Sequence, residues 1–207
     1  MKVGASIFEL GDLITVQFGF PFRGSIEVVA DGAVSVVQMK DVNPDTGVHW
    51  PGLLRTELPG LKKPDWLRVD DILFISRGTR FYAVCLDTPP SPSVCNTHFL
   101  HLRAMLNKKV VPAFVAWQIN QAPFQRLLQQ SAEGSSQLSI RRPILESLAL
   151  HIPSLADQQR IVALAASAQR ERQVLQRLIR NREHQLQALA EQLAGNRHPS
   201  EQEAIQL

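Results

Sequence analysis

The segment Cys95-Asn-Thr-His98-Phe-Leu-His101 holds the residue types most often used for thiol catalysis or metal binding. We expect it to be extended, and residues three apart on an extended strand face opposite sides. The thiol and the two imidazoles should therefore not converge. Four zinc-type ligands at paired spacing are also absent from the sequence. We expect no metal site, and a hydrolase that uses Cys95 and His98 is the least favoured alternative.

Other enzyme classes lack their motifs. An adenine methyltransferase needs a Gly-rich loop after a strand and a tetrapeptide such as N-P-P-F. The nearest match, Asn43-Pro44-Asp45-Thr46, has the wrong third and fourth residues and reads as a turn. No Walker A loop and no tight cluster of Asp, Glu and Lys of the nuclease type is present. We expect the chain not to be an enzyme and to bind no cofactor of its own.

Basic and amide side chains in polar loops are the better candidates, because cations bind phosphates and forked side chains read base edges. The run ILFISRGTRFYAVCL predicts a hairpin whose tip is Arg77-Gly78-Thr79-Arg80, with Gly78 able to take a positive φ. Such a tip can enter a groove of duplex DNA. The candidate DNA contacts are Arg23, Lys40, Asn43, Arg77, Thr79, Arg80, Ser135, Ser136, Gln137, Arg141 and Arg142.

These cations also have a plain structural alternative. Arg77 and Arg80 can be solvated, or paired with an acid of the neighbouring sequence such as Asp70, Asp71 or Asp87. Lys40 can form a salt bridge with Asp41.

Two kinds of element must position these residues. Residues 1 to about 110 predict a β-rich region, because runs such as LITVQF, AVSVVQM, ILFIS and FYAVCL are apolar and end at turn-forming residues. From Val111 the spacing becomes helical, a polar loop follows at Gly134–Gln137, and RRPILESLALHIP predicts one short helix and one strand. The fold class is α+β, a β-rich domain followed by a long C-terminal coiled-coil helix.

The C-terminal helix is predicted to begin after Ser154, which with Asp157 fits a capping box, and to run for about 40 residues, roughly 60 Å. Its apolar stripe is interrupted by Glu171 and by Arg182, where the heptad spacing has a stutter. An opposing helix could offer Glu171 to Arg182. The expected dimerisation residues are Ile161, Leu164, Ala168, Leu175, Leu178, Leu186, Leu189 and Leu193.

A helix longer than its domain should project and take a partner helix, although it could instead fold back on its own domain. Residues 160–182 hold six arginines against one acid, Glu171. These arginines can line a DNA channel, meet an acidic partner or be a solvated flank. The division we expect is a domain at 1–150, a helical arm at 151–195 and a disordered tail at 196–207.

The composition, 44% hydrophobic with a net charge of +3, is that of a globular chain with a mild bias toward polyanions. Two cysteines make a disulfide scaffold improbable and favour a reducing, cytoplasmic setting. The first residues carry Glu9 and Asp12 and do not predict a secretory signal. No apolar run is long enough to span a membrane.

Several segments in order resemble type I restriction-modification specificity subunits. They are Leu10-Gly11-Asp12, Gly19–Gly24, Val37–Val42, Asp71–Phe74 with Arg77-Gly78, Gly134-Ser135 with Ile140 and Leu145, and Ile152-Pro153 with Gln158 or Gln159 and Ile161. The resemblance covers about residues 9–193. No single piece is specific, so the order and spacing carry the resemblance.

The resemblance implies a non-catalytic DNA reader whose residues 1–150 are a target-recognition domain. Such subunits carry two recognition domains and two long helices, on which modification subunits dock and methylate adenine with S-adenosylmethionine. This chain looks like half of one, so a homodimer reading inverted half-sites is the expectation, with a different half-subunit as the alternative partner. A restriction or translocase subunit could accompany the complex. The competing function is a coiled-coil scaffold with a protein- or RNA-binding β-rich domain.

Overall fold

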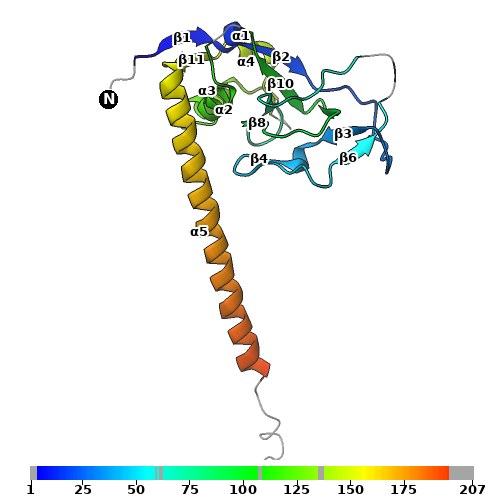
Figure 1. The fold of residues 1–207 in the computed structure, drawn as a ribbon, viewed down its shortest axis with the longest axis vertical. Coiled ribbons are helices and arrows are strands. Elements are labelled where there is room, and N and C mark those ends of the chain that lie inside the picture. The colour runs from blue at the N-terminus through cyan, green and yellow to red at the C-terminus, as the bar shows by residue number, and fades with distance from the viewer. Residues whose placement is uncertain (1–3, 59, 61–62, 107–108, 135–137, 196–207) are drawn as a thin grey trace, which may run out of the picture. The chain divides into compact units, whose positions relative to one another are not determined.

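The computed structural model describes residues 4–58, 60, 63–106, 109–134 and 138–195 (Figure 1). The strands are β1 (Ser6–Glu9), β2 (Ile14–Phe18), β3 (Val34–Val37), β4 (Val42–Asn43), β5 (Gly47–Val48), β6 (Leu54–Thr56), β7 (Ile72–Ile75), β8 (Tyr82–Cys85), β9 (Ser93–Cys95), β10 (Phe99–Ala104) and β11 (Ala149–Ile152). The helices are α1 (Leu10–Leu13), the 3₁₀ turn η1 (Met39–Asp41), α2 (Pro112–Ile119), α3 (Ala122–Ser131), α4 (Arg142–Glu146) and α5 (Leu155–Gly195). The tail expected at 196–207 and the loop residues Ser135–Gln137 lie outside the described residues.

The central sheet has four antiparallel strands in the order β2-β10-β7-β8. Strand β7 is buried at every position, which is why its sequence, Ile-Leu-Phe-Ile, is continuously apolar. One side of this strand faces the larger core, which holds Ile72 and Phe74, and the other faces a second core, which holds Leu73 and Ile75. The predicted hairpin is therefore built on a strand with two buried faces, which fixes its register.

A smaller sheet has the strand order β6-β3-β9, with β3 antiparallel to β6 and parallel to β9. The two-stranded ribbon β4–β5 follows η1 directly. The tyrosine that begins β8 ties this ribbon to the central sheet, because its hydroxyl donates to the carbonyl oxygen of Val42 at 3.0 Å. The segment around Lys40 and Asn43 is thereby fixed beside the β7–β8 hairpin.

The helical segment after Val111 is two helices where the sequence pattern suggested one periodic stretch. The break lies at Asn120, whose side-chain amide donates to the carbonyl of Ala83 and accepts from its N–H, both at 2.8 Å. The side chain thus completes the hydrogen bonding of the β8 edge as a neighbouring strand would. Pro112 and Pro123 lie in the first turns of α2 and α3, where a missing N–H costs nothing.

The short helix and strand expected in RRPILESLALHIP are α4 and β11. Strand β11 pairs antiparallel with β1, so the beginning of the described chain lies beside the segment that leads into α5. The N–H of Leu10 also donates to the carbonyl of Leu148 at 2.8 Å.

Helix α5 begins as the sequence indicates. The N–H of Asp157 donates to the Ser154 hydroxyl at 3.2 Å, and that hydroxyl donates to the Asp157 carboxylate at 2.7 Å. In the predicted capping box the carboxylate would reach back to the backbone, whereas in the structure it accepts from the Ser154 hydroxyl. The cap accepts one of the orphan N–H groups of the first turn.

The compact unit of the domain runs through Ala163, beyond the division expected at residue 150. The reason is that the first two turns of α5 pack on the core. Gln158 is fully buried, and its side chain accepts from the N–H of Val111 at 2.8 Å and donates to the carbonyl of Pro153 at 2.9 Å. Ile161 and Val162 lie half-buried against the larger core. The second unit is Leu164–Leu207.

The expected fold class is confirmed: a β-rich α+β domain is followed by a long C-terminal helix. Within the described residues, no helix is both long and apolar enough to cross a membrane.

Candidate nucleic-acid interface

The hairpin β7–β8 presents the strongest candidates at its turn. Ile75 pairs with Tyr82, so the six residues 76–81 form the turn. Arg77, Thr79 and Arg80 are exposed in it. Gly78 has φ +117°, a region that L side chains rarely adopt. The predicted hairpin, its tip and the role of its glycine are therefore present in the structure.

Two segments distant in sequence meet this tip. The N–H of Gly78 donates to the carbonyl of Leu138 at 3.0 Å, and the N–H of Ile140 donates to the carbonyl of Ser76 at 2.8 Å. On another side, a methyl placed on Gly78 would lie 4.0 Å from the terminal carbon of Met39. We call residues 39–43, 77–80 and 138–142 the tip surface, since these contacts bring the three segments together.

The cations of the tip surface differ in whether a carboxylate already binds them. Arg141 is paired with Glu133 at 2.6 Å and Arg142 with Glu146 at 2.7 Å, so these guanidinium groups already have carboxylate partners. No salt bridge holds Lys40, Arg77 or Arg80 among the residues that the structure describes. The three cations without a carboxylate are those best placed for a polyanion.

The aspartates that could have paired with Arg77, Arg80 or Lys40 either form hydrogen bonds with other residues or are exposed and form no salt bridge with these cations in the described part of the chain. Asp71 binds His101 and Arg103, and Asp87 accepts from the indole N–H of Trp50 at 2.8 Å. Asp41 accepts from the N–H of Gln38 at 2.9 Å and caps η1. Asn43 accepts from the N–H of Asp45 at 2.8 Å, which gives its side chain a turn-forming role in addition to any contact with DNA.

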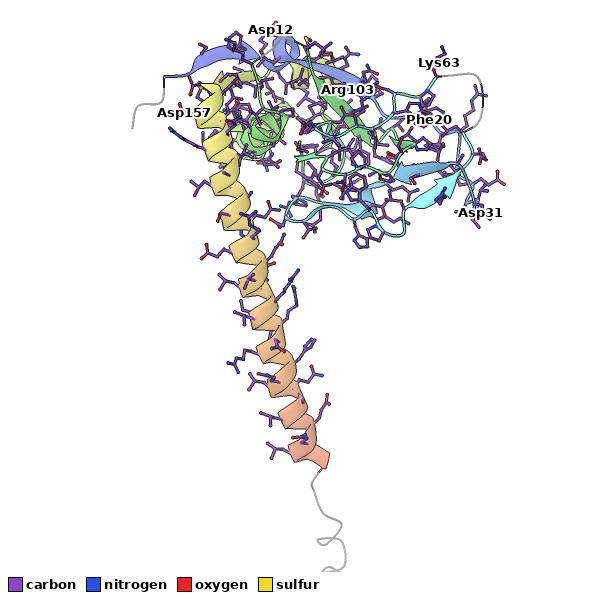
Figure 2. The ribbon with its side chains drawn as sticks, in the orientation of Figure 1. Asp12, Phe20, Asp31, Lys63, Arg103 and Asp157 are labelled. Atoms are coloured by element: carbon purple, nitrogen blue, oxygen red, sulfur yellow. The ribbon has the colours of Figure 1, made fainter. Side chains whose placement is uncertain are left out.

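Arg23 belongs to a different part of the domain. It lines a cavity of about 540 Å³ that includes an edge-to-face pair of rings, Phe20 and Phe22, with centroids 5.0 Å apart. Figure 2 labels Phe20. None of the residues that line this cavity belongs to the tip surface. Among the predicted contacts, Ser135, Ser136 and Gln137 lie outside the described residues.

A buried ionic network supports the base of the hairpin and was missed by the sequence reasoning. Asp71, 1% exposed, immediately precedes β7 and accepts two hydrogen bonds from Arg103, from Nε and Nη2, both at 2.7 Å. It also accepts from His101 Nε2 at 2.8 Å and from the N–H of Arg68 at 2.8 Å. Arg103 (labelled in Figure 2, on β10) donates in addition to Asp65 at 2.7 Å.

Within this network, Asp71 and Arg103 are held in their charged forms. Burial alone would raise the pKa of Asp71, but the hydrogen bonds from His101 and Arg103 outweigh burial and hold that pKa below its usual value. The hydrogen bonds that Arg103 donates to Asp71 likewise raise the pKa of Arg103. The signal in the sequence was the pattern Phe-Leu-His-Leu-Arg-Ala, which puts His101 and Arg103 on one face of an otherwise apolar strand.

The cysteines do not support a nucleophile. Burial raises the pKa of Cys85 and that of Cys95 to about 12, so both thiols stay protonated at neutral pH. His98 is exposed whereas His101 is buried. Within the described residues, no group of three or more potential ligands could hold a metal ion.

The stripe of α5 is exposed along most of its length. Leu175, Leu178 and Leu189 are 53–55% exposed, and Leu164, Leu186 and Leu193 are 67–75% exposed. Ile161 is the exception among the expected dimerisation residues, since it packs partly on the core of its own domain. The resemblance left open whether Gln158 or Gln159 matches; Gln158 is the buried one.

No protein-family model matches the chain, and no curated protein does either. Several solved structures match the chain. A chain from a structure of complex assembly and conformational transition of the type I R-M system superposes with a TM-score of 0.64 at 16% identity, covering 91% of this chain and 44% of that one. The HsdS subunit from Thermoanaerobacter tengcongensis gives 0.57 at 16% identity, covering 95% and 50%. The type I restriction-modification S subunit from M. genitalium gives 0.54 at 14% identity, covering 80% and 39%.

At these identities the similarity establishes the fold, and the resemblance noted in the sequence is confirmed at that level. This chain spans half or less of the length of each of the three proteins.

Proposed function

We propose that this chain is a non-catalytic DNA sequence-recognition subunit of a type I restriction-modification system. The supporting observation is the fold shared with S subunits over 80–95% of the chain. A partner modification subunit would supply adenine methylation and bind S-adenosylmethionine. A restriction or translocase subunit would join when the system also cleaves, and the setting is the cytoplasm.

The tip surface is the proposed contact with duplex DNA. A hairpin turn is narrow enough to enter a groove, and Arg77 and Arg80 can form bidentate bonds to guanine or bind phosphates. Lys40 and Thr79 lie on the same surface, so they would contact the flanking backbone. Ser135–Gln137 stay candidates because they join Gly134 to Leu138, whose carbonyl is bonded to the tip. Arg141 and Arg142 would have to exchange their glutamates for phosphates, which makes them secondary contacts.

A bipartite DNA site requires a second reading module, and the exposed stripe of α5 is the surface by which we propose that it is joined. Burying six leucines against a partner helix contributes on the order of 10–20 kcal/mol before association costs. A second copy is the partner that needs no further assumption, and a different half-subunit is the alternative.

The test compares Arg77→Ala and Arg80→Ala with Lys63→Ala, which removes the same charge outside the tip-surface segments. Duplexes are selected from a random pool by the full chain, alone and with a modification subunit encoded in its genomic neighbourhood. We expect a preferred sequence, a loss of roughly 5- to 150-fold in affinity for it in each tip variant, and a shallower salt dependence. Unchanged affinity in both tip variants would remove the assignment.

A second candidate function is an interaction scaffold. It is favoured by the exposed leucines of α5, together with the fact that two arginines of the tip surface, Arg141 and Arg142, already have carboxylate partners. It predicts that the domain binds protein or RNA. Equal affinity for the selected duplex and random duplex, with tighter binding to RNA or to a protein partner, would favour the scaffold.

A further inference from the structure

The stripe of α5 carries two charged residues, and their signs and positions are informative. Glu171 and Arg182 are both exposed and belong to the same stripe as the leucines. Two copies of the helix in parallel register would place Glu171 against Glu171 and Arg182 against Arg182. Like charges facing each other at the centre of a helix pair destabilise it, so the stripe disfavours that arrangement.

Reading the stripe from both ends inward gives a complete antiparallel pairing. The facing residues would be Ile161 with Leu193, Leu164 with Leu189, Ala168 with Leu186, Glu171 with Arg182, and Leu175 with Leu178. Every apolar member meets an apolar member, the smallest one meets a leucine, and the single acid meets the single base. A two-fold axis between Gln176 and Arg177 generates each of these layers twice.

Resting on the proposed function, we infer that two copies of this chain pair antiparallel along α5 in this register, with the axis between Gln176 and Arg177 and a Glu171–Arg182 ion pair in two symmetric layers. The stutter at Arg182 is then the feature that lets the acid and the base face each other while the leucines beyond stay in contact. The ion pair selects the register, as polar residues in helix seams do.

A competing register is centred on Arg182 itself, because the spacing of the leucines is also symmetric about that residue. It pairs Leu178 with Leu186 and Leu175 with Leu189, but it sets the two Arg182 side chains against each other and leaves Glu171 facing Leu193. Arg182 Nη1 donates to Gln185 Oε1 at 3.1 Å in the single chain, and that bond would not compensate two facing guanidinium groups. The two registers therefore differ in which leucines touch.

Cysteine cross-linking tests the register in the full chain. Leu164→Cys is mixed with Leu189→Cys, both exposed positions, and oxidised under mild conditions. The native thiols are a silent background, because burial raises the pKa of Cys85 and of Cys95 to about 12. We expect a disulfide-linked dimer from this mixture alone. A dimer from Leu164→Cys by itself indicates the parallel pair, and one from Leu175→Cys mixed with Leu189→Cys indicates the Arg182-centred pair; either overturns the inference.

Charge exchange tests the ion pair independently. Glu171→Arg and Arg182→Glu should each weaken the dimer by at least about tenfold in sedimentation equilibrium, because each creates two like-charge layers. The double variant restores the pair and should return to within about threefold of the original chain. Circular dichroism serves as the control, because each variant should keep the helix content of the original chain. Failure of the double variant to recover, or a chain that stays monomeric at tens of micromolar, contradicts the register.

These outcomes separate the register from the proposed function. A chain that cross-links as expected but prefers no duplex sequence keeps the register and loses the DNA-reading role. A chain that selects a duplex through Arg77 and Arg80 but cross-links in another register keeps the role and loses the register.

Discussion

Asp71→Asn is the substitution for which the structure gives the sharpest stability expectation. The new amide keeps the shape of the carboxylate but loses its charge and puts N–H donors where one oxygen now accepts. Four hydrogen bonds reach the Asp71 carboxylate: two from Arg103, one from His101 Nε2 and one from the N–H of Arg68. Breaking one side of a buried ion pair costs about 3–5 kcal/mol, and we expect the lower end because Arg103 is 27% exposed and keeps Asp65.

For a domain of this size, a loss of about 3 kcal/mol lowers the melting temperature by roughly 6–12 °C. The assay is urea unfolding at pH 7, followed by circular dichroism, with Asp70→Asn as the matched control. Asp70 is the neighbouring aspartate, is exposed and has φ +69°, which asparagine tolerates. The control should change the free energy of unfolding by less than about 0.5 kcal/mol. A loss below about 1 kcal/mol for Asp71→Asn would refute the view that this network holds the base of the hairpin.

Further expectations concern the same domain. Because the pKa of Asp71 is lowered on folding, the unfolded chain takes up the proton first as pH falls. The stability that Asp71 contributes is therefore complete at pH values above the ordinary pKa of an aspartate and is lost as the pH falls through its lowered pKa. Asp71→Asn should flatten that part of a stability–pH profile measured by urea midpoints. Gln158→Leu should lower the free energy of unfolding in a urea titration by about 2–4 kcal/mol, because it leaves the N–H of Val111 and the carbonyl of Pro153 without partners. The control Gln159→Leu, at an exposed position, should lower it by less than about 0.5 kcal/mol. Equal losses would contradict the anchoring role of Gln158. Gly78→Val should lower stability by about 1–3 kcal/mol because φ +117° is strained for a β-branched residue, and it should weaken duplex binding in the selection assay. The control is Thr97→Val, an exposed position outside the tip-surface segments, which should change neither readout.

The hairpin and the start of α5 could be predicted because their signals are local. Two apolar runs on either side of Arg77–Arg80 predict paired strands with a turn at Gly78. Ser154 and Asp157 predict a helix start because their hydrogen bond joins residues only three positions apart. The split of the helical region at Asn120 could not be predicted. Its cause is a pair of bonds to Ala83 on the distant strand β8, and nothing in the helical spacing records them.

The candidate site was predicted in part for the same reason. The exposed cations Arg77 and Arg80 follow from the hairpin, but the pairing of Arg141 with Glu133 and the separate position of Arg23 depend on how distant loops pack. Ile161 shows the limit on the helix: its spacing places it on the stripe, yet the core of its own domain partly covers it.

The sequence by itself determined the periodic features of this protein: buried strands, a capped C-terminal helix and a leucine stripe that carries one acid and one base. Those features depend on residues a few positions apart, and backbone geometry alone turns them into structure. Three features depended on the tertiary structure: which cations already have carboxylate partners, which buried side chains form hydrogen bonds at the base of the hairpin, and at which residue of α5 the domain ends. Each of these depends on contacts between residues far apart in the chain, such as Asp71 with Arg103 and Val111 with Gln158, and periodicity carries no information about such pairs.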